Sequence, residues 1–376
     1  MNGKNIREWE MEFGNAILSD MYSFLLALAS ALLFGLATPL SKGLLSYWTP
    51  QQLAGLLYLG AALGVAIPMA LERQTFFPRR AGGTNIGRLF GAIVFGGILG
   101  PVFLLAGLKL ASASSVSLWL NLEMVATAIL GVLLFRDHLG KLGWMGAACI
   151  LAAGVLLSWG EGAAGLKAGI FLILACLCWG MDNNLTALID GLLPMQSTFW
   201  KGLVAGSFNL ALGLSLHPHP GSIGSAIGLP LLLALVTGAF CYGASIVLYI
   251  TAAQNLGATR SQMVFASAPL FGLMFSVLWL REPLGFYHAA AMGFQCLGIF
   301  FLFKDRHSHM HAHEALEHTH AHTHADGHHT HTHEGLPPSH RHSHPHRHEP
   351  MSHAHPHWPD LHHRHGHGEA GVSARS

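Results

Sequence analysis

Long apolar runs separated by short polar connections occupy the chain from residue 22 to residue 303. Each run has about the 20 residues that an α-helix needs to cross the hydrocarbon core of a bilayer. The pattern therefore predicts an all-α membrane protein with ten transmembrane helices. The expected spans are 22–46, 52–71, 87–108, 111–134, 141–159, 166–188, 194–216, 228–252, 259–280 and 285–303.

The composition excludes a soluble protein. Charged residues make up 10% of the chain and hydrophobic residues 51%, whereas a soluble domain has roughly 25% charged residues. The basic residues are dispersed and form no stripe, so we expect the lipid bilayer as a partner and no nucleic acid. The five cysteines all lie in apolar runs and are expected to be small buried hydrophobes.

Two halves of the apolar region correspond at a constant shift of 145 residues. "ALLFGLATPLSK" (31–42) aligns with "CLCWGMDNNLTA" (176–187), and "VLLFRDHLG" (132–140) aligns with "VLWLREPLG" (277–285). The constant shift indicates duplication of a five-helix unit, and an odd number of spans inserts the second copy upside down. Inverted repeats are typical of secondary transporters, whose site lies near the membrane midplane between the repeats.

Four parts of the chain follow from this pattern. We expect an N-terminal cytoplasmic segment over 1–21, a first five-helix repeat over 22–160, a second over 161–303, and a disordered histidine-rich cytoplasmic tail over 304–376. The small-xxx-small pair in "GLVAG" (202–206) serves either packing inside one bundle, which we favour, or contact between two copies in a homodimer.

Basic residues predict the orientation in the membrane, because Lys and Arg gather on the cytoplasmic side. Placing the N-terminus inside puts most of them in cytoplasmic loops, and an even number of spans returns the C-terminus to the same side. The protein is therefore expected in the inner or plasma membrane with both termini cytoplasmic. The basic residues concerned are Arg73, Arg79, Arg80, Arg88, Arg136, Lys141, Lys304 and Arg306.

The ends of the fourth and ninth spans, "NLEMVATAILGVLLFRDHLG" (121–140) and "ASAPLFGLMFSVLWLREPLG" (266–285), resemble the EamA family of the drug/metabolite transporter superfamily. The five-plus-five plan and the aromatic-glycine steps in spans one and six are also similar. Met124 stands where that family usually has a proline, and Ala268 precedes Pro269 in place of a glutamate. The resemblance covers residues 22–303 and implies a ten-helix, gradient-driven transporter, often an exporter.

Polar side chains inside the spans are candidates for the substrate pathway, because a charge facing lipid costs about 2.5–3.5 kcal/mol on insertion scales. Glu123 lies near the middle of the fourth span, where it either couples transport to a proton or is satisfied by a neighbouring helix. Asp182 lies four residues after Cys178, a spacing compatible with metal ligation; the alternatives are a polar lining for an organic substrate and hydrogen bonding between helices. Lys42 either binds a carboxylate of the substrate or extends to the interface. Amides complete the predicted pathway: Asn121, Asn183 and Asn184.

Histidines make up much of the tail, with 24 of the 28 in the chain after residue 306. Their H-x-H spacing brings imidazoles to one side of an extended chain, and neutral imidazole binds Ni²⁺, Co²⁺ and Zn²⁺. The alternative is a solubilising tail without a metal role. No resident cofactor is expected, apart from such ions on the tail. The predicted metal ligands are His307, His309, His311, His313, His318, His320, His322, His324, His328, His329, His331 and His333.

Taken together, these features favour a secondary transporter that exports a divalent transition metal such as nickel, cobalt or zinc. The first alternative is export of a small organic metabolite or amino acid, with a tail that senses or buffers metal. The second is a membrane metal store or sensor that transports nothing. The chain contains no G-x-x-x-x-G-K-[ST], H-E-x-x-H or G-x-S-x-G motif, so an enzyme is not expected.

Overall fold

The computed structural model describes residues 6–77, 82–135, 139–189, 192–217, 228–256, 261, 264–304, 307–313, 316–322, 342–348 and 351–357. They fall into two compact units, a helical unit that contains residues 6–304 and a second unit within Arg306–Trp358.

The first repeat contains the helices of the predicted spans one to five. Its elements are α1 (Ile6–Leu44), α2 (Pro50–Leu71), α3 (Gly83–Ala92), the π-helix η1 (Ile93–Leu99), α4 (Gly100–Leu110), α5 (Ala113–Trp119), α6 (Leu122–Phe135) and α7 (Lys141–Gly160). Local sequence explains the start of α2, where Pro50 occupies the first turn and Thr49 forms a capping box with Gln52. The Thr49 hydroxyl accepts from the Gln52 N–H at 3.3 Å.

The second repeat follows the same order. Its elements are α8 (Gly162–Ala187), α9 (Pro194–Leu216), α11 (Leu229–Thr237), the π-helix η2 (Gly238–Ala244), α12 (Ser245–Leu256), α14 (Ala268–Leu280) and α15 (Phe286–Lys304).

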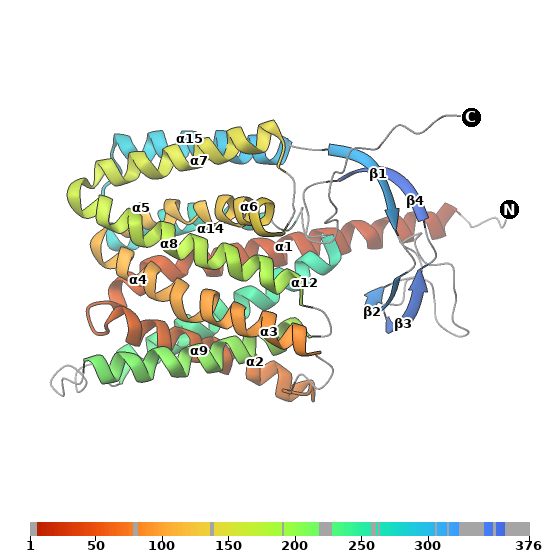
Figure 1. Cartoon of the computed structure of the whole chain (residues 1–376), viewed down its shortest axis with the longest axis horizontal. Coiled ribbons are helices and arrows are strands. Elements are labelled where there is room, and N and C mark those ends of the chain that lie inside the picture. Colours follow the sequence, from red (N-terminus) through yellow and green to blue (C-terminus); the bar gives the residue numbers. More distant parts are fainter. Residues whose placement is uncertain are drawn as a thin grey trace. The chain divides into compact units, whose positions relative to one another are not determined.

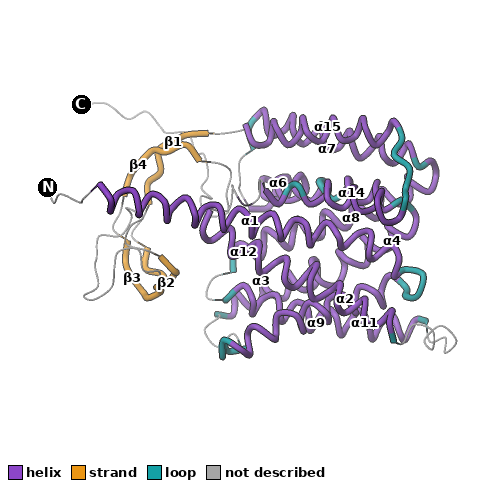
Figure 2. Tube along the Cα trace, turned by 180° about the vertical axis from the view of Figure 1, so that it is seen from behind, coloured by secondary structure: helices purple, strands orange, loops and turns teal. Residues whose placement is uncertain are grey.

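The duplication read from the sequence is confirmed by these bounds. The π-helix Ile93–Leu99, moved by 145 residues, falls on the π-helix Gly238–Ala244. The contacts between the repeats follow the same symmetry. In each repeat the first helix packs on the other repeat: α1 packs on α12 and α14, and its counterpart α8 packs on α4 and α6. In Figure 1, α1 and α8 run in opposite directions through the bundle, as an inverted repeat requires. The paired helices α2 with α9 and α7 with α15 lie side by side in both views (Figures 1 and 2).

Every predicted span contains helix, and seven of the described helical stretches are long and apolar enough to cross a membrane. Two further apolar helices, within 268–280 and 286–302, are shorter. The remaining span is α9, which has 23 residues and packs along α2. The chain is therefore a multi-pass membrane protein.

The structure changes five of the predicted spans, in three ways. The N-terminal segment is continuous with the first span, because α1 begins at Ile6. The third and eighth spans each contain a π-helical turn. The fourth span is broken at residues 120–121, between α5 and α6, and the ninth has a turn at residues 266–267, just before α14. Discontinuous helices of this kind occur at the binding sites of transporters.

Glycines bring α2 and α9 into close contact. A Cβ at Gly202 would lie 2.7 Å from the Tyr58 carbonyl oxygen, and a Cβ at Gly206 would lie 2.7 Å from the Leu59 nitrogen. The "GLVAG" pair therefore packs inside one chain, the interpretation favoured from the sequence.

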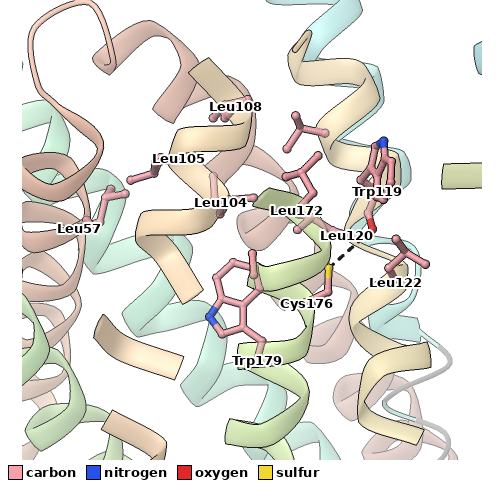
Figure 3. Close-up of a cluster of buried hydrophobic side chains, with 14 of the residues drawn as sticks. Leu57, Leu104, Leu105, Leu108, Trp119, Leu120, Leu122, Leu172, Cys176 and Trp179 are labelled. Carbon is pink, nitrogen blue, oxygen red and sulfur yellow. Dashed lines mark hydrogen bonds between the residues drawn. The ribbon is translucent and has the colours of Figure 1, made fainter. Parts of the chain in front are cut away.

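The apolar core of the first repeat continues onto α8. Figure 3 shows Leu104, Leu105 and Leu108 on α4 beside Leu172 and Trp179 of α8. The Cys176 thiol contacts the Trp119 carbonyl at 3.9 Å. Cys176, Cys178 and Cys241 are buried as predicted, whereas Cys149 is partly exposed and Cys296 is exposed.

Four strands correct the prediction of a tail without regular structure. They are β1 (His307–His313), β2 (Leu316–His322), β3 (His342–His348) and β4 (Met351–His357). Two antiparallel sheets form, β1 with β4 and β2 with β3. The prediction relied on the low apolar content of the tail. The alternation of histidine with other residues has the period of two that is typical of a strand, and it is compatible with extended backbone.

Candidate functional site

Helix α8 carries a row of polar side chains, and each contacts a different neighbouring element. The indole N–H of Trp179 donates to the Gly96 carbonyl of η1 at 3.0 Å. The carboxylate of Asp182 binds Lys201 of α9, and the amide of Asn183 binds Glu123 of α6. Since η1 and α6 belong to the first repeat while α8 and α9 belong to the second, these contacts cross the interface between the repeats.

The π-helix η1 has carbonyl groups that side chains satisfy. The Tyr58 hydroxyl of α2 donates to the Gly96 carbonyl at 2.5 Å, where Trp179 also donates. The Asn209 amide of α9 donates to the Gly97 carbonyl at 3.1 Å and to the Ile98 carbonyl at 3.2 Å. A π-helical turn disturbs the regular ladder of backbone bonds and is frequent at functional sites.

Asp182 and Lys201 form a close ion pair. The Lys201 Nζ lies 2.6 Å from Asp182 Oδ1 and 2.7 Å from Oδ2, and the Thr186 hydroxyl donates to Oδ1 at 2.9 Å. The exposed fraction is 16% for the Lys201 side chain and 10% for the Asp182 side chain. Gly96 leaves room for the carboxylate, because a Cβ there would overlap with it.

Glu123 lies in the first turn of α6, directly after the break in the fourth span. The N-terminus of a helix carries a partial positive charge, which favours a carboxylate at this place. The Asn183 amide donates to Glu123 Oε1 at 2.9 Å and to the Thr127 hydroxyl at 3.2 Å. Glu123 is partly exposed, and no lysine or arginine among the described residues is within ion-pair distance of it.

The two carboxylates belong to one electrostatic group. Glu123 interacts unfavourably with Asp182 and favourably with Lys201. The Asp182–Lys201 pair is neutral as a whole, so this group of three has one net negative charge when Glu123 is ionised.

Asn184, Asn121 and Lys42 have structural partners. Asn184 is fully buried and donates to the Thr127 carbonyl at 3.0 Å. Asn121 donates to Gln295 at 3.0 Å, away from Glu123. The Lys42 ammonium donates to the Leu108 and Ala111 carbonyls at 2.6 and 2.7 Å, so it caps the end of α4.

A metal centre on α8 is not supported by the geometry. Asp182 binds Lys201 where the sequence suggested a metal shared with Cys178. Among the residues that the structure describes, no group of three or more His, Cys, Asp and Glu side chains could hold a metal ion.

Only part of the predicted tail ligand set lies within the described residues. His307, His309, His311 and His313 are in β1, and His318, His320 and His322 are in β2. Those outside the described residues are His324, His328, His329, His331 and His333.

Lys201 is a candidate site residue that the sequence reasoning missed. It is the one charged residue of "PMQSTFWKGLVAGSFNLALGLSL", and it lies seven residues after the start of α9. Asp182 lies five residues before the end of α8. Because a short connection joins the two helices, these spacings place both residues at a similar depth. Glu123 was selected as a charged residue inside an apolar span, and the same criterion would also have found Lys201.

Comparison with known proteins gives consistent results. Residues 21–159 and 166–304 each match the EamA-like transporter family, and these segments are again 145 residues apart. An uncharacterized transporter of Methanothermobacter thermautotrophicus is 25% identical over 308 residues, 77% of this chain and 88% of the relative. An uncharacterized transporter of Synechocystis is 25% identical over 313 residues, 78% of this chain and 93% of the relative. One crystal structure, 15% identical, covers 75% of this chain and 96% of its own with a TM-score of 0.54, a likeness of fold alone.

Proposed function

The chain belongs to the EamA-like transporter family, and from this premise we propose that it moves a small organic solute with a positively charged group, which Glu123 binds. The observation that carries the proposal is the state of Glu123. Its carboxylate is partly exposed, is held by Asn183, and has no cation paired with it among the described residues. A solute ammonium group would supply the missing positive charge.

The surroundings of Glu123 support an organic solute over a bare metal ion. Asn183 and Thr127 can exchange hydrogen bonds with an organic molecule, and the second carboxylate that a divalent ion would need is bound to Lys201. Transition metals prefer several converging nitrogen, sulfur or oxygen ligands, and the described part of the bundle has no such group. An amino acid or another small metabolite with an amine therefore fits better.

Uptake of labelled amines and amino acids into vesicles that contain the purified full-length protein tests this proposal. We expect Glu123→Gln to abolish transport, because it removes the charge and keeps the shape. Glu123→Asp should retain part of it. A matched control adds Gln295→Glu to the Glu123→Gln variant. It places a carboxylate beside Asn121 and not at position 123, and it should not restore transport. Transport unaffected by Glu123→Gln would refute the assignment.

A second candidate function is handling of nickel, cobalt or zinc by the tail. The backbone register places histidine opposite histidine at six positions. Directly opposed residues are the closest pairs of an antiparallel ladder, and imidazole is a good ligand for these metals. The opposed pairs are His307 with His357, His309 with His355, His311 with His353, His318 with His346, His320 with His344 and His322 with His342.

The two candidates are separable in the full chain. If the tail only buffers or senses metal, replacing its histidines with glutamine should remove metal binding measured by calorimetry and leave amine transport unchanged. If the bundle exports metal, Glu123→Gln should lower metal efflux from vesicles while the histidine tail still binds.

Orientation and direction complete the proposal. We place both termini in the cytoplasm and the solute flow outward across the inner or plasma membrane, on the distribution of Lys and Arg and on the family resemblance. Labelling of a cysteine introduced at Ser376 in intact cells and in inverted vesicles tests the orientation. Labelling in intact cells would contradict it.

A further inference from the structure

We propose that Lys201 is a specificity-determining residue: by neutralising Asp182 it leaves one net negative charge on the group with Glu123, and so selects singly charged cations over doubly charged ones. This inference rests on the proposed function, because it requires Glu123 to bind the charged group of the solute.

The geometry makes the pair a fixed element of the site. Lys201 Nζ is within 2.7 Å of both carboxylate oxygens of Asp182, and the Thr186 hydroxyl adds a third bond. On the other side, the two glycines of η1 make room, Gly96 for the carboxylate and Gly97 for the lysine stem, whose Cγ would lie 3.2 Å from a Cβ at Gly97. The hydrogen bonds to Asp182 on one side and the close packing against η1 on the other hold the Lys201 ammonium at Asp182.

Charge counting then predicts selectivity. Asn183, the residue after Asp182, donates to Glu123 Oε1 at 2.9 Å, which places the ion pair next to Glu123 along the same helix. Asp182 and Lys201 are accordingly the charged groups that act on Glu123. A monocation at Glu123 brings the group to zero, whereas a dication leaves one uncompensated positive charge beside the Lys201 ammonium. Uncompensated charge in a medium of low polarity is costly, so the dication is disfavoured as long as Lys201 is present.

The pair is a property of one half of the protein. The residues 145 positions earlier are Ala37 and Leu56, which carry no charge. The duplicated fold therefore does not require the pair. In the first repeat an alanine and a leucine fill the equivalent places, so packing alone needs no charged residues there.

Two matched probes test the inference, butylammonium and butane-1,4-diammonium, which share a primary amine and differ in charge. Binding to the full-length protein in nanodiscs is measured by competition calorimetry at equal ionic strength. We expect the wild type to bind the monocation at least tenfold more tightly. Lys201→Met, with two net negative charges, should lower this preference at least tenfold or invert it. Lys201→Arg keeps the charge and should keep the preference.

The double variant Asp182→Asn/Lys201→Met decides the case if Lys201→Met alone does not fold. It removes both charges, leaves Glu123 as the single negative group, and should retain the wild-type preference within about threefold. Loss of the preference in the double variant, or an unchanged preference in Lys201→Met, overturns the inference. Butylammonium binding that survives Glu123→Gln instead refutes the proposed function, so the two failures are distinguishable.

Discussion

Helices α1 and α8 occupy equivalent places in the two repeats, yet their surroundings differ in kind. α8 presents Asp182 to a lysine and Asn183 to a glutamate. At the equivalent place α1 has Ala37, which is buried in the apolar core. The second repeat therefore supplies the lysine–aspartate pair, whereas α1 supplies apolar support at the equivalent place in the first repeat.

The contacts of α1 around Phe34 and Ser30 are correspondingly neutral. Phe34, which aligns with Trp179, packs on Tyr242 and Phe265 with ring centroids 6.0 and 5.4 Å away. The Ser30 hydroxyl donates to the Ser245 carbonyl of α12 at 2.7 Å, and the Ser245 hydroxyl donates back to the Ser30 carbonyl at 3.0 Å. The comparison teaches that the duplicated fold tolerates loss of symmetry in chemistry while it keeps symmetry in packing.

The largest effect on stability is expected on the α8 side, from Lys201→Met. Removing the cation leaves Asp182 buried without its partner, which costs about 3–5 kcal/mol. The repeat-related change Leu56→Met replaces one apolar side chain with another and should cost less than about 1.5 kcal/mol. Thermal unfolding in detergent compares the two, and equal losses would mean that the charge pair does not distinguish the repeats.

Gly96→Ala should have the next largest effect. The new methyl group would overlap with the Asp182 carboxylate, and overpacking of this kind costs about 1–3 kcal/mol. We expect a lower melting temperature together with weaker solute binding. Gly293→Ala is the control, since a Cβ at Gly293 has open space around it. Its behaviour should match the wild type.

Trp179→Phe makes the α8 side resemble α1, where Phe34 stands. It removes the indole donor to the Gly96 carbonyl, a bond worth about 0.5–1.5 kcal/mol. Trp200→Phe removes a similar bond, to the Phe76 carbonyl at 2.8 Å, outside the site. Both variants should lose similar stability, but only Trp179→Phe should alter transport. A transport defect in both would count against a special role for η1.

The smallest effect is expected on the α1 side, from Ser30→Ala. Side-chain hydrogen bonds between transmembrane helices average about 0.6 kcal/mol, and this change removes one donor between α1 and α12. The melting temperature should shift only slightly, and transport should be unchanged. A transport loss as large as that of Trp179→Phe would end the contrast between the two helices.

The frame of the molecule could be predicted from the sequence because it follows from regular signals. Apolar length predicts the spans, and the shift of 145 residues predicts the repeat. The break before Glu123 could not be predicted, since Leu120 and Asn121 are neither glycine nor proline. The π-helical turns leave no distinct mark in an evenly apolar run.

The candidate site was predicted only in part. Glu123, Asp182 and Asn183 are close to one another across α6 and α8, as polar residues at depth suggested. The role of Lys42 depends on the carbonyl end of α4, a tertiary contact between residues 66 and 69 positions apart. No local pattern reports such a contact.

The matched π-helical turns have an evolutionary consequence. An irregularity found at corresponding places in both copies was present in the ancestral half-length polypeptide before the two genes fused. The lysine–aspartate pair, present in a single copy, was acquired by one descendant or lost by the other after that event. The ancestor thus already had the bend, whereas the difference in charge between the two copies arose after the duplication.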